Sequence, residues 1–226
     1  PSVADVSFRV DGAVLNAFVT DFIGAPEQRF RLSIYKGVNL FWVGNVQTDN
    51  VRKQDKEYPY IFSIRAADGL ALLKDIDYNN DGVAYEGTAT IAKHVCNALS
   101  KIGTSDLFSD LLAVNNNWYS DQHTTSSDVY NTSKIDYRRF IEIDSTGTKT
   151  YKSCYYVLES ICKAFGSRIV LSDGLFRIVQ INEYEGGNLS FLTYDSDGLP
   201  SSSYANTSYR LSDGTDILRL YGGSFQ

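Results

Sequence analysis

Residues 58–74, YPYIFSIRAADGLALLK, constrain the fold most, because a strand pattern there runs directly into a helix pattern. Apolar and polar residues alternate with a period of two up to Ala66, which is typical of a strand with one buried face. Asp68 follows and can cap a short helix, because its side-chain oxygen can accept a hydrogen bond from a backbone N–H of the first turn. Leu70 and Leu73 predict the buried side of that helix.

The first third of the chain carries further alternating segments. VSFRV and AVLNAFV, joined at Asp11-Gly12, predict a β-hairpin, because Asp-Gly between alternating segments favours a tight turn. RFRLSIYK (29–36) and LFWVGNVQ (40–47) predict a second hairpin that turns at Gly37. These short connections indicate a run of antiparallel strands, and we expect a small barrel or sandwich.

Helix and strand patterns are mixed in the rest of the chain. Apolar residues at helical spacing predict helices over 90–102 and 151–165, which end at Gly103 and Gly166. Residues 167–182 alternate on both sides of a glycine and predict a hairpin. The chain is therefore predicted to be α+β, with antiparallel β-barrel-type domains, inserted amphipathic helices and more strands than helices.

Three parts follow from these patterns. We expect an N-terminal β-barrel-type domain at 1–75, a helical and loop insertion at 76–137, and a second β-rich part at 138–226. Strand patterns at 138–144 and 167–194 are the candidates for a second barrel. The chain contains no Met and begins at a proline, so we expect it to be a piece of a longer polypeptide or a processed product.

Composition argues against two classes of partner. The chain has 226 residues with 43% hydrophobic and 21% charged residues, which is ordinary for a globular protein. Its net charge is −6, and its densest basic patches are the dipeptides at 52–53 and 138–139, so a phosphate-tracking surface is not expected. No apolar run approaches the roughly 18 residues of a membrane span, so we expect no span.

Residues with catalytic potential belong to no recognisable motif. His94 lies in the predicted helix and His123 in a polar loop, and neither is placed as a catalytic triad or a zinc hydrolase would require. Cys96, Cys154 and Cys162 form no Cys-x-x-Cys pair and fall within helical patterns, where free cysteine behaves as a small buried hydrophobe. We therefore expect no catalytic residues and no cofactor.

One segment, Asp77-Tyr-Asn79-Asn-Asp81-Gly82, fits the first six positions of a calcium loop. The twelfth position, which normally supplies a bidentate Glu, is Thr88. Asx-rich turns also form for local hydrogen-bonding reasons. The segment is therefore either a turn between elements, which we favour, or a calcium site with ligands from Asp77, Asn79 and Asp81.

Aromatic residues leave a binding function open. Sixteen Tyr and twelve Phe could form a sugar-binding surface, with Trp118 beside an Asn-rich loop, although most of them occupy alternating strand positions typical of a core. A carbohydrate-binding or adhesion module of a phage or bacterial surface protein is therefore an alternative. A glycan hydrolase is a third reading, and it would need two carboxylates converging in a cleft.

Three segments in order resemble the hub proteins of bacteriophage tails, of the kind found in myophage baseplates and siphophage tail tips. The first is IYKGVNLFWVGNVQTDN followed by YIFSIRAADGLALLKDIDY. The second is YEGTATIAKHVCNALSKIG, and the third is CYYVLESICKAFGSRIVLSDGLFRIVQI. The resemblance covers about residues 28–182, and the polar loop at 115–136 departs from the pattern.

The resemblance implies a structural protein without enzymatic activity. Three chains with two similar barrels each would form a pseudo-sixfold ring, which joins the tail tube or distal tail proteins above to a spike or fibre below. DNA would pass through its lumen without specific binding, and the protein would belong to the virion tail after assembly in the host bacterial cytoplasm. The residues expected to matter structurally are Gly37, Trp42, Gly44, Phe62, Asp68, Gly69, Leu70, Gly87, Phe165, Gly166 and Gly174.

Overall fold

The structure is a computed structural model with two compact units. The first unit contains the residues up to Ala71 together with 171–174, and the second contains the rest. The described residues are 2–23, 25–26, 29–50, 57–115, 127–181 and 189–206.

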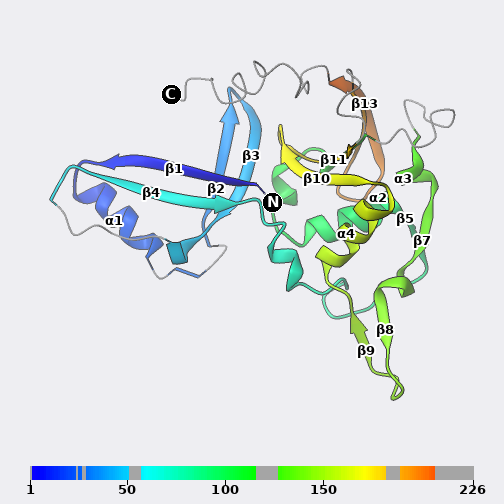
Figure 1. The fold of residues 1–226 in the computed structure, drawn as a ribbon. Coiled ribbons are helices and arrows are strands. Elements are labelled where there is room, and N and C mark those ends of the chain that lie inside the picture. Colours follow the sequence, from blue (N-terminus) through cyan, green and yellow to red (C-terminus); the bar gives the residue numbers. More distant parts are fainter. Residues whose placement is uncertain are drawn as a thin grey trace. The chain divides into compact units, whose positions relative to one another are not determined.

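The first unit is built on a curled antiparallel sheet that forms half of a barrel (Figure 1). The strand order is β1-β4-β3-β2, so β1 and β2 are the edges. β1 and β4 pair over their full lengths, from Val3 opposite Ala67 to Val10 opposite Tyr60. The predicted α+β class and the antiparallel barrel-type sheet are confirmed. The strands are β1 (Val3–Val10), β2 (Arg31–Lys36), β3 (Asn39–Val46) and β4 (Tyr60–Ala67).

The alternation predicted for β4 is present in the structure. Tyr60, Phe62, Ile64 and Ala66 are buried, while the residues between them are exposed. The Phe62 ring contacts the ring of Phe8 at a centroid distance of 5.2 Å. Burial of this one face anchors the sheet to its core.

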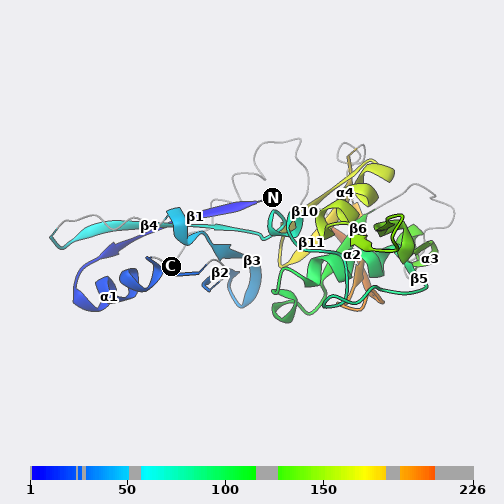
Figure 2. The same cartoon turned by 90° about the horizontal axis from the view of Figure 1, so that it is seen from below.

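The predicted hairpin around Asp11-Gly12 is wrong, because the second segment is the helix α1 (Ala13–Phe22). Gly12 has φ −172° and ψ −179°, which is extended backbone and not the positive φ of a tight hairpin turn. Val19 and Phe22, three residues apart, are both buried, as on one side of a helix. Figures 1 and 2 show α1 on one side of β1 and β4, where the Phe22 ring lies 6.3 Å from that of Phe62.

The second unit contains a five-stranded sheet with the order β10-β11-β6-β12-β13. β11 runs parallel to β6, with Phe176 opposite Leu112, whereas β12 is antiparallel to both β6 and β13. The predicted hairpin at 167–182 is confirmed as β10 and β11. The strands are β6 (Leu112–Asn115), β10 (Ser167–Ser172), β11 (Leu175–Gln180), β12 (Leu189–Tyr194) and β13 (Pro200–Asn206).

Both predicted helices of this unit are confirmed, as α2 (Ile91–Ser100) and α4 (Cys154–Ala164). They lie side by side (Figures 1 and 2). α2 is buried on almost all sides, which makes it the centre of the unit. Within the described residues, no helix is long and apolar enough to cross a membrane.

Smaller elements correct three expectations. The helix predicted after Asp68 is only a 3-10 turn, Leu72–Lys74. The strand predicted at 138–144 begins as a 3-10 turn, and its remainder, β8, pairs with β9 instead of joining the five-stranded sheet. The described end of the predicted loop at 115–136 contains α3 and β7. The small elements are β5 (Thr88–Thr90), α3 (Val129–Thr132), β7 (Lys134–Asp136), β8 (Ile141–Ile143), β9 (Lys149–Tyr151) and the 3-10 turns Thr48–Asn50, Ser105–Leu107 and Tyr137–Phe140.

Candidate functional site

In the first unit, the two halves of the first resemblance segment are linked at the side chain of Trp42. Its indole Nε1–H donates to Ser2 Oγ (2.9 Å), and Ser2 Oγ donates to Asp68 Oδ2 (2.9 Å). Asp68 Oδ1 also accepts from the backbone N–H of Leu70 (3.1 Å), which forms an Asx turn in place of the predicted helix cap. This Trp42–Ser2–Asp68 chain of hydrogen bonds ties β3, the start of β1 and the end of β4 together.

Gly44 lies where a side chain has no space. A Cβ there would be 2.3 Å from Cη2 of Trp42 and 2.5 Å from the carbonyl oxygen of Ala67. Gly37 differs, because it has φ +62° in the β2–β3 turn and open space around it. Gly44 is therefore a close approach between strands, and Gly37 is a turn position.

The other residues predicted to matter also occupy structural positions. Phe62 and Leu70 are buried, and Phe165 is half-buried with its ring 5.1 Å from that of Tyr130. Gly174 lies in the β10–β11 turn, where its N–H donates to Phe41 O (2.9 Å). The three remaining predicted glycines also have a positive φ, as do Gly37 and Gly174 (+70°): Gly69 (+82°), Gly87 (+78°) and Gly166 (+54°).

In the second unit, His94 is a fully buried imidazole on α2. Its Nε2 donates to the carbonyl oxygen of Ile135 (3.0 Å), so Nδ1 is the acceptor for the Tyr78 hydroxyl (2.8 Å). Burial lowers the pKa of His94, and the hydrogen bond to Ile135 opposes part of this effect. Both ring nitrogens are thus used within the fold, and the aromatic rings of Tyr137 and Phe140 pack on the imidazole.

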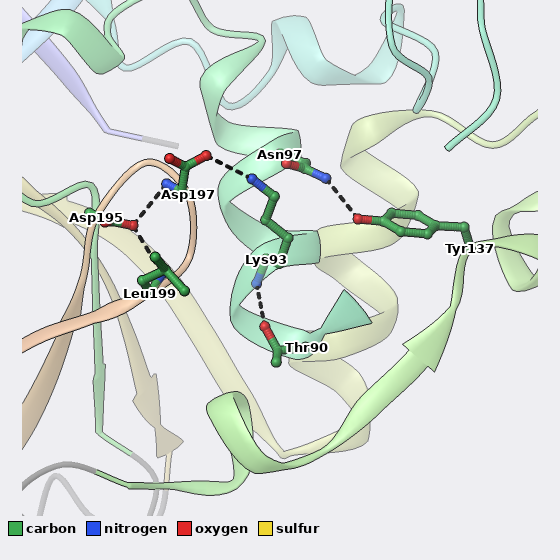
Figure 3. Close-up of polar contacts among 7 residues, drawn as sticks. All are labelled: Thr90, Lys93, Asn97, Tyr137, Asp195, Asp197 and Leu199. Carbon is green, nitrogen blue, oxygen red and sulfur yellow. Dashed lines mark hydrogen bonds and ion pairs between the residues drawn. The ribbon is translucent and has the colours of Figure 1, made fainter. Parts of the chain in front are cut away.

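Polar contacts along α2 join it to distant segments (Figure 3). Asn97 donates to the hydroxyl of Tyr137 (3.2 Å), and Lys93 Nζ pairs with Asp197 Oδ1 (3.0 Å). The turn between β12 and β13 approaches the helix so closely that a Cβ at Gly198 would lie 2.6 Å from Cα of Lys93. Asp195 holds this turn by accepting from two backbone N–H groups. The contacts position the turn on the helix.

Asp128 is a buried carboxylate that the sequence analysis missed. Its Oδ1 accepts from the N–H groups of Tyr130 (2.8 Å) and Asn131 (3.1 Å) and from the hydroxyl of Tyr194. The Asp128 N–H in turn donates to Asn131 Oδ1 (3.0 Å), and this bond completes a capping box for α3. Burial and the neighbouring carboxylate raise the pKa of Tyr194. The Asp-x-x-Asn spacing before α3 is the sequence signal for this cap.

The calcium-loop segment is folded as a turn. Asn79 Oδ1 accepts from the N–H of Gly82 (2.9 Å), a local side-chain-to-backbone bond that closes the turn. Asp81 pairs with Lys101 (2.9 Å), and this lysine lowers the pKa of the carboxyl group. Among the described residues, no group of three or more His, Cys, Asp or Glu is placed to hold a metal ion.

The cysteines are free thiols within α2 and α4, as the helical patterns predicted. Burial raises the pKa of Cys96 to about 12 and that of Cys154 to about 11, so both stay protonated and weakly nucleophilic at neutral pH. The candidates His123 and Trp118 lie outside the described residues.

No protein-family model and no curated protein matches the chain. Among solved structures, the chain is similar to the 43 kDa tail protein of prophage MuSo2 from Shewanella oneidensis, with 16% sequence identity and a TM-score of 0.40. The match covers 78% of this chain and 45% of that protein, so the chain spans less than half of its length. At this level of likeness, a functional proposal for the chain rests on its own motifs and geometry.

Proposed function

We propose that the chain is a structural hub protein of a bacteriophage tail. Three copies would form a pseudo-sixfold ring that joins the tail tube to the central spike or fibre, without enzymatic activity of its own. The observation that carries the proposal is the meeting of the two halves of the first motif in one curled sheet, where Trp42 is linked through Ser2 to Asp68. The protein would then be a component of the virion tail.

The edges of the sheet support assembly into a ring. β1 pairs with β4 and β2 with β3, and neither edge strand has a second partner strand among the described residues. The pairing is antiparallel throughout, so β1 and β2 run in opposite directions. A neighbour's β2 could therefore pair with β1 and extend the same antiparallel sheet.

Charge supports a channel through which DNA passes without being held. The chain carries 27 acidic against 21 basic residues. DNA binding requires clustered basic side chains that replace the counterions of the phosphates. An acidic ring would repel the duplex weakly and leave its path open.

The oligomeric state tests the proposal. Light scattering across a concentration series is expected to give a trimer, or monomers that converge on a trimer as concentration rises. A monomer at every concentration, both free and when mixed with purified tail tubes, would contradict the ring.

A proline in β2 tests the role of the sheet edge. The N–H of Val46 donates to Phe30 O (2.9 Å), and the register then places Leu32 in the next hydrogen-bonded pair with β3. The N–H of Ser33 consequently points toward the open edge. Ser33→Pro removes this outward donor without removing a β2–β3 bond.

One lost hydrogen bond is worth about 1 kcal/mol per contact, so Ser33→Pro should raise the midpoint concentration of assembly by about fivefold to tenfold for each contact. Ser33→Ala keeps the N–H and is the matched control. Equal assembly of the two variants would exclude β2 as the pairing edge while leaving the hub proposal to the mass measurement.

A further inference from the structure

Asp-Gly pairs recur in this chain, and such pairs are chemically labile. The side-chain carboxyl group of an aspartate can cyclise onto the backbone nitrogen of the next residue, and a glycine leaves that nitrogen unhindered. The reaction needs an accessible carboxyl group and a backbone N–H that is not held in a hydrogen bond. The described residues contain five such pairs, at 11–12, 68–69, 81–82, 173–174 and 197–198.

In three of the five pairs, the fold holds the glycine N–H in a hydrogen bond. The N–H groups of Gly82, Gly174 and Gly198 donate to Asn79 Oδ1 (2.9 Å), Phe41 O (2.9 Å) and Asp195 O (3.0 Å), respectively. Each bond must break before the nitrogen can attack the carboxyl group, so the native structure protects these pairs.

In the fourth pair, the fold holds the carboxyl group instead. Asp68 is only 2% exposed, and its side chain accepts from Ser2 Oγ (2.9 Å) and from the N–H of Leu70 (3.1 Å). Its burial also keeps away the water that opens the cyclic intermediate. This pair is therefore protected as well.

The fifth pair, Asp11-Gly12, has neither protection. The Asp11 side chain is 61% exposed and is held by Arg9 Nε (2.6 Å) in an ion pair that lies in solvent, where such pairs are weak. The N–H of Gly12 has no hydrogen-bond partner in the part of the chain that the structure describes. A Cβ at Gly12 would have no atom within 4 Å, so the surroundings of the nitrogen are open.

We propose that Asp11-Gly12 is the site at which the folded chain isomerises to isoaspartate. Gly12 N bonds to Asp11 Cγ, and the N–H proton leaves with the carboxyl hydroxyl as water, which gives a five-membered succinimide. Water then adds to the α-carbonyl carbon of Asp11, the bond from this carbon to Gly12 N breaks, and the nitrogen regains a proton. The main chain now runs through Cβ and Cγ of residue 11, and the α-carboxylate is free.

The position of the pair gives the modification a structural effect. The chain passes from β1 to α1 through residues 11 and 12 alone. Gly12 O accepts from the N–H of Asn16 (3.1 Å), and Asn16 Oδ1 accepts from the hydroxyl of Tyr60 on β4 (2.8 Å). An additional methylene group in this short link displaces the start of α1 from the sheet, so the modified first unit is less stable.

Peptide mapping of the whole chain after prolonged incubation at neutral pH tests the proposal. Trypsin releases the pairs at 11–12, 81–82 and 173–174 in separate peptides, 10–29, 75–93 and 169–177. Isoaspartate should form in peptide 10–29 about fivefold faster than in the other two, because a hydrogen bond of about 1 kcal/mol lowers the fraction of free N–H by this factor. Incubation in urea removes the protection, and the three rates should then become similar.

Two substitutions at the exposed residue 11 separate the chemistry from other ageing. Asp11→Glu keeps the charge but would need a six-membered ring, so peptide 10–29 should stay unmodified. Asp11→Asn releases ammonia in place of water and should react faster. The wild-type fraction that carries isoaspartate at 11 should unfold at a lower urea concentration than Asp11→Glu aged in parallel.

The outcomes are distinct from those of the mass measurement, because each is read on the chain itself and none requires a ring. Equal isoaspartate formation in the three peptides of the folded chain, or faster formation at 81 or 173 than at 11, would overturn the proposal. Isoaspartate at 11 with an unchanged urea midpoint would overturn its structural effect on α1.

Discussion

Gly44→Ala should destabilise the first unit although it adds only one methyl group. The new Cβ would lie 2.3 Å from the Trp42 indole and 2.5 Å from the Ala67 carbonyl oxygen, and both distances are far below van der Waals contact. Ala67 is paired with Val3 and with Asn45, so its backbone cannot retreat without disturbing two ladders. The indole would have to move instead.

The expected cost follows from two effects. Overpacking by one methyl group costs about 1–3 kcal/mol, and displacing the indole loses its hydrogen bond to Ser2, worth about 1 kcal/mol. We therefore expect a loss of about 2–4 kcal/mol. With a urea slope of about 1–2 kcal/mol per molar for a unit of this size, the midpoint should fall by about 1–4 M.

Urea unfolding followed by tryptophan fluorescence measures this change. A Trp118→Phe background leaves Trp42 as the only tryptophan, so the signal reports the first unit. Gly37→Ala is the matched control, because a Cβ added at Gly37 would have no atom within 4 Å. The substitution should cost only the strain of a positive φ, about 1–2 kcal/mol. A Gly44→Ala midpoint equal to or above that of Gly37→Ala would refute the reasoning.

Three further predictions concern other sites. Trp42→Ala should cost about 3–5 kcal/mol by leaving a cavity, and an unchanged urea midpoint, followed by circular dichroism, would disprove its placement. Because the folded-state pKa of His94 is lowered, the unfolded state binds more protons below pH 6.5, so stability should fall as pH drops from 7 to 5. His94→Gln should flatten this dependence in urea titrations, whereas His123→Gln should keep it. A dependence that His123→Gln flattens and His94→Gln keeps would show that His94 is not its source. Millimolar calcium should leave the melting temperature at its value in chelator, and a rise that Asp81→Asn abolishes would establish the site that we disfavour.

Local patterns were sufficient where periodicity and end signals agreed. α2 combines helical spacing with a Thr90 cap, whose Oγ1 accepts from the Lys93 N–H (3.2 Å), and with Gly103 after its end. α4 has the same combination in Ser153 and Gly166. Each signal is weak, but together they select one conformation over a short window of sequence.

The same reasoning failed at α1 because two local signals disagreed. Asp11-Gly12 favours a turn between strands, whereas the three-residue spacing of Val19 and Phe22 favours a helix. The structure resolves the conflict through tertiary packing, since Phe22 contacts both Phe30 and Phe62. A contact with a residue as far along the chain as Phe62 cannot be predicted from a local pattern.

Contacts between segments far apart in the sequence could not be predicted from local patterns either. The parallel ladder of β6 and β11 joins segments about sixty residues apart, and the bond from Trp42 to Ser2 spans forty. Neither strand carries a residue type that specifies its partner. The sequence nevertheless indicated that Gly44 lies at a close approach, because glycine within a strand often marks a position where another backbone comes near.

The buried polar residues share a use that bears on function. His94 joins α2 to β7 through Ile135, Asp128 joins α3 to Tyr194 on β12, and Asp68 reaches the start of β1 through Ser2. A buried polar group that binds within the fold fixes one arrangement of its elements, because breaking the bond leaves an unsatisfied group behind. In the hub that we propose, such rigidity would help each subunit to keep its shape within the ring.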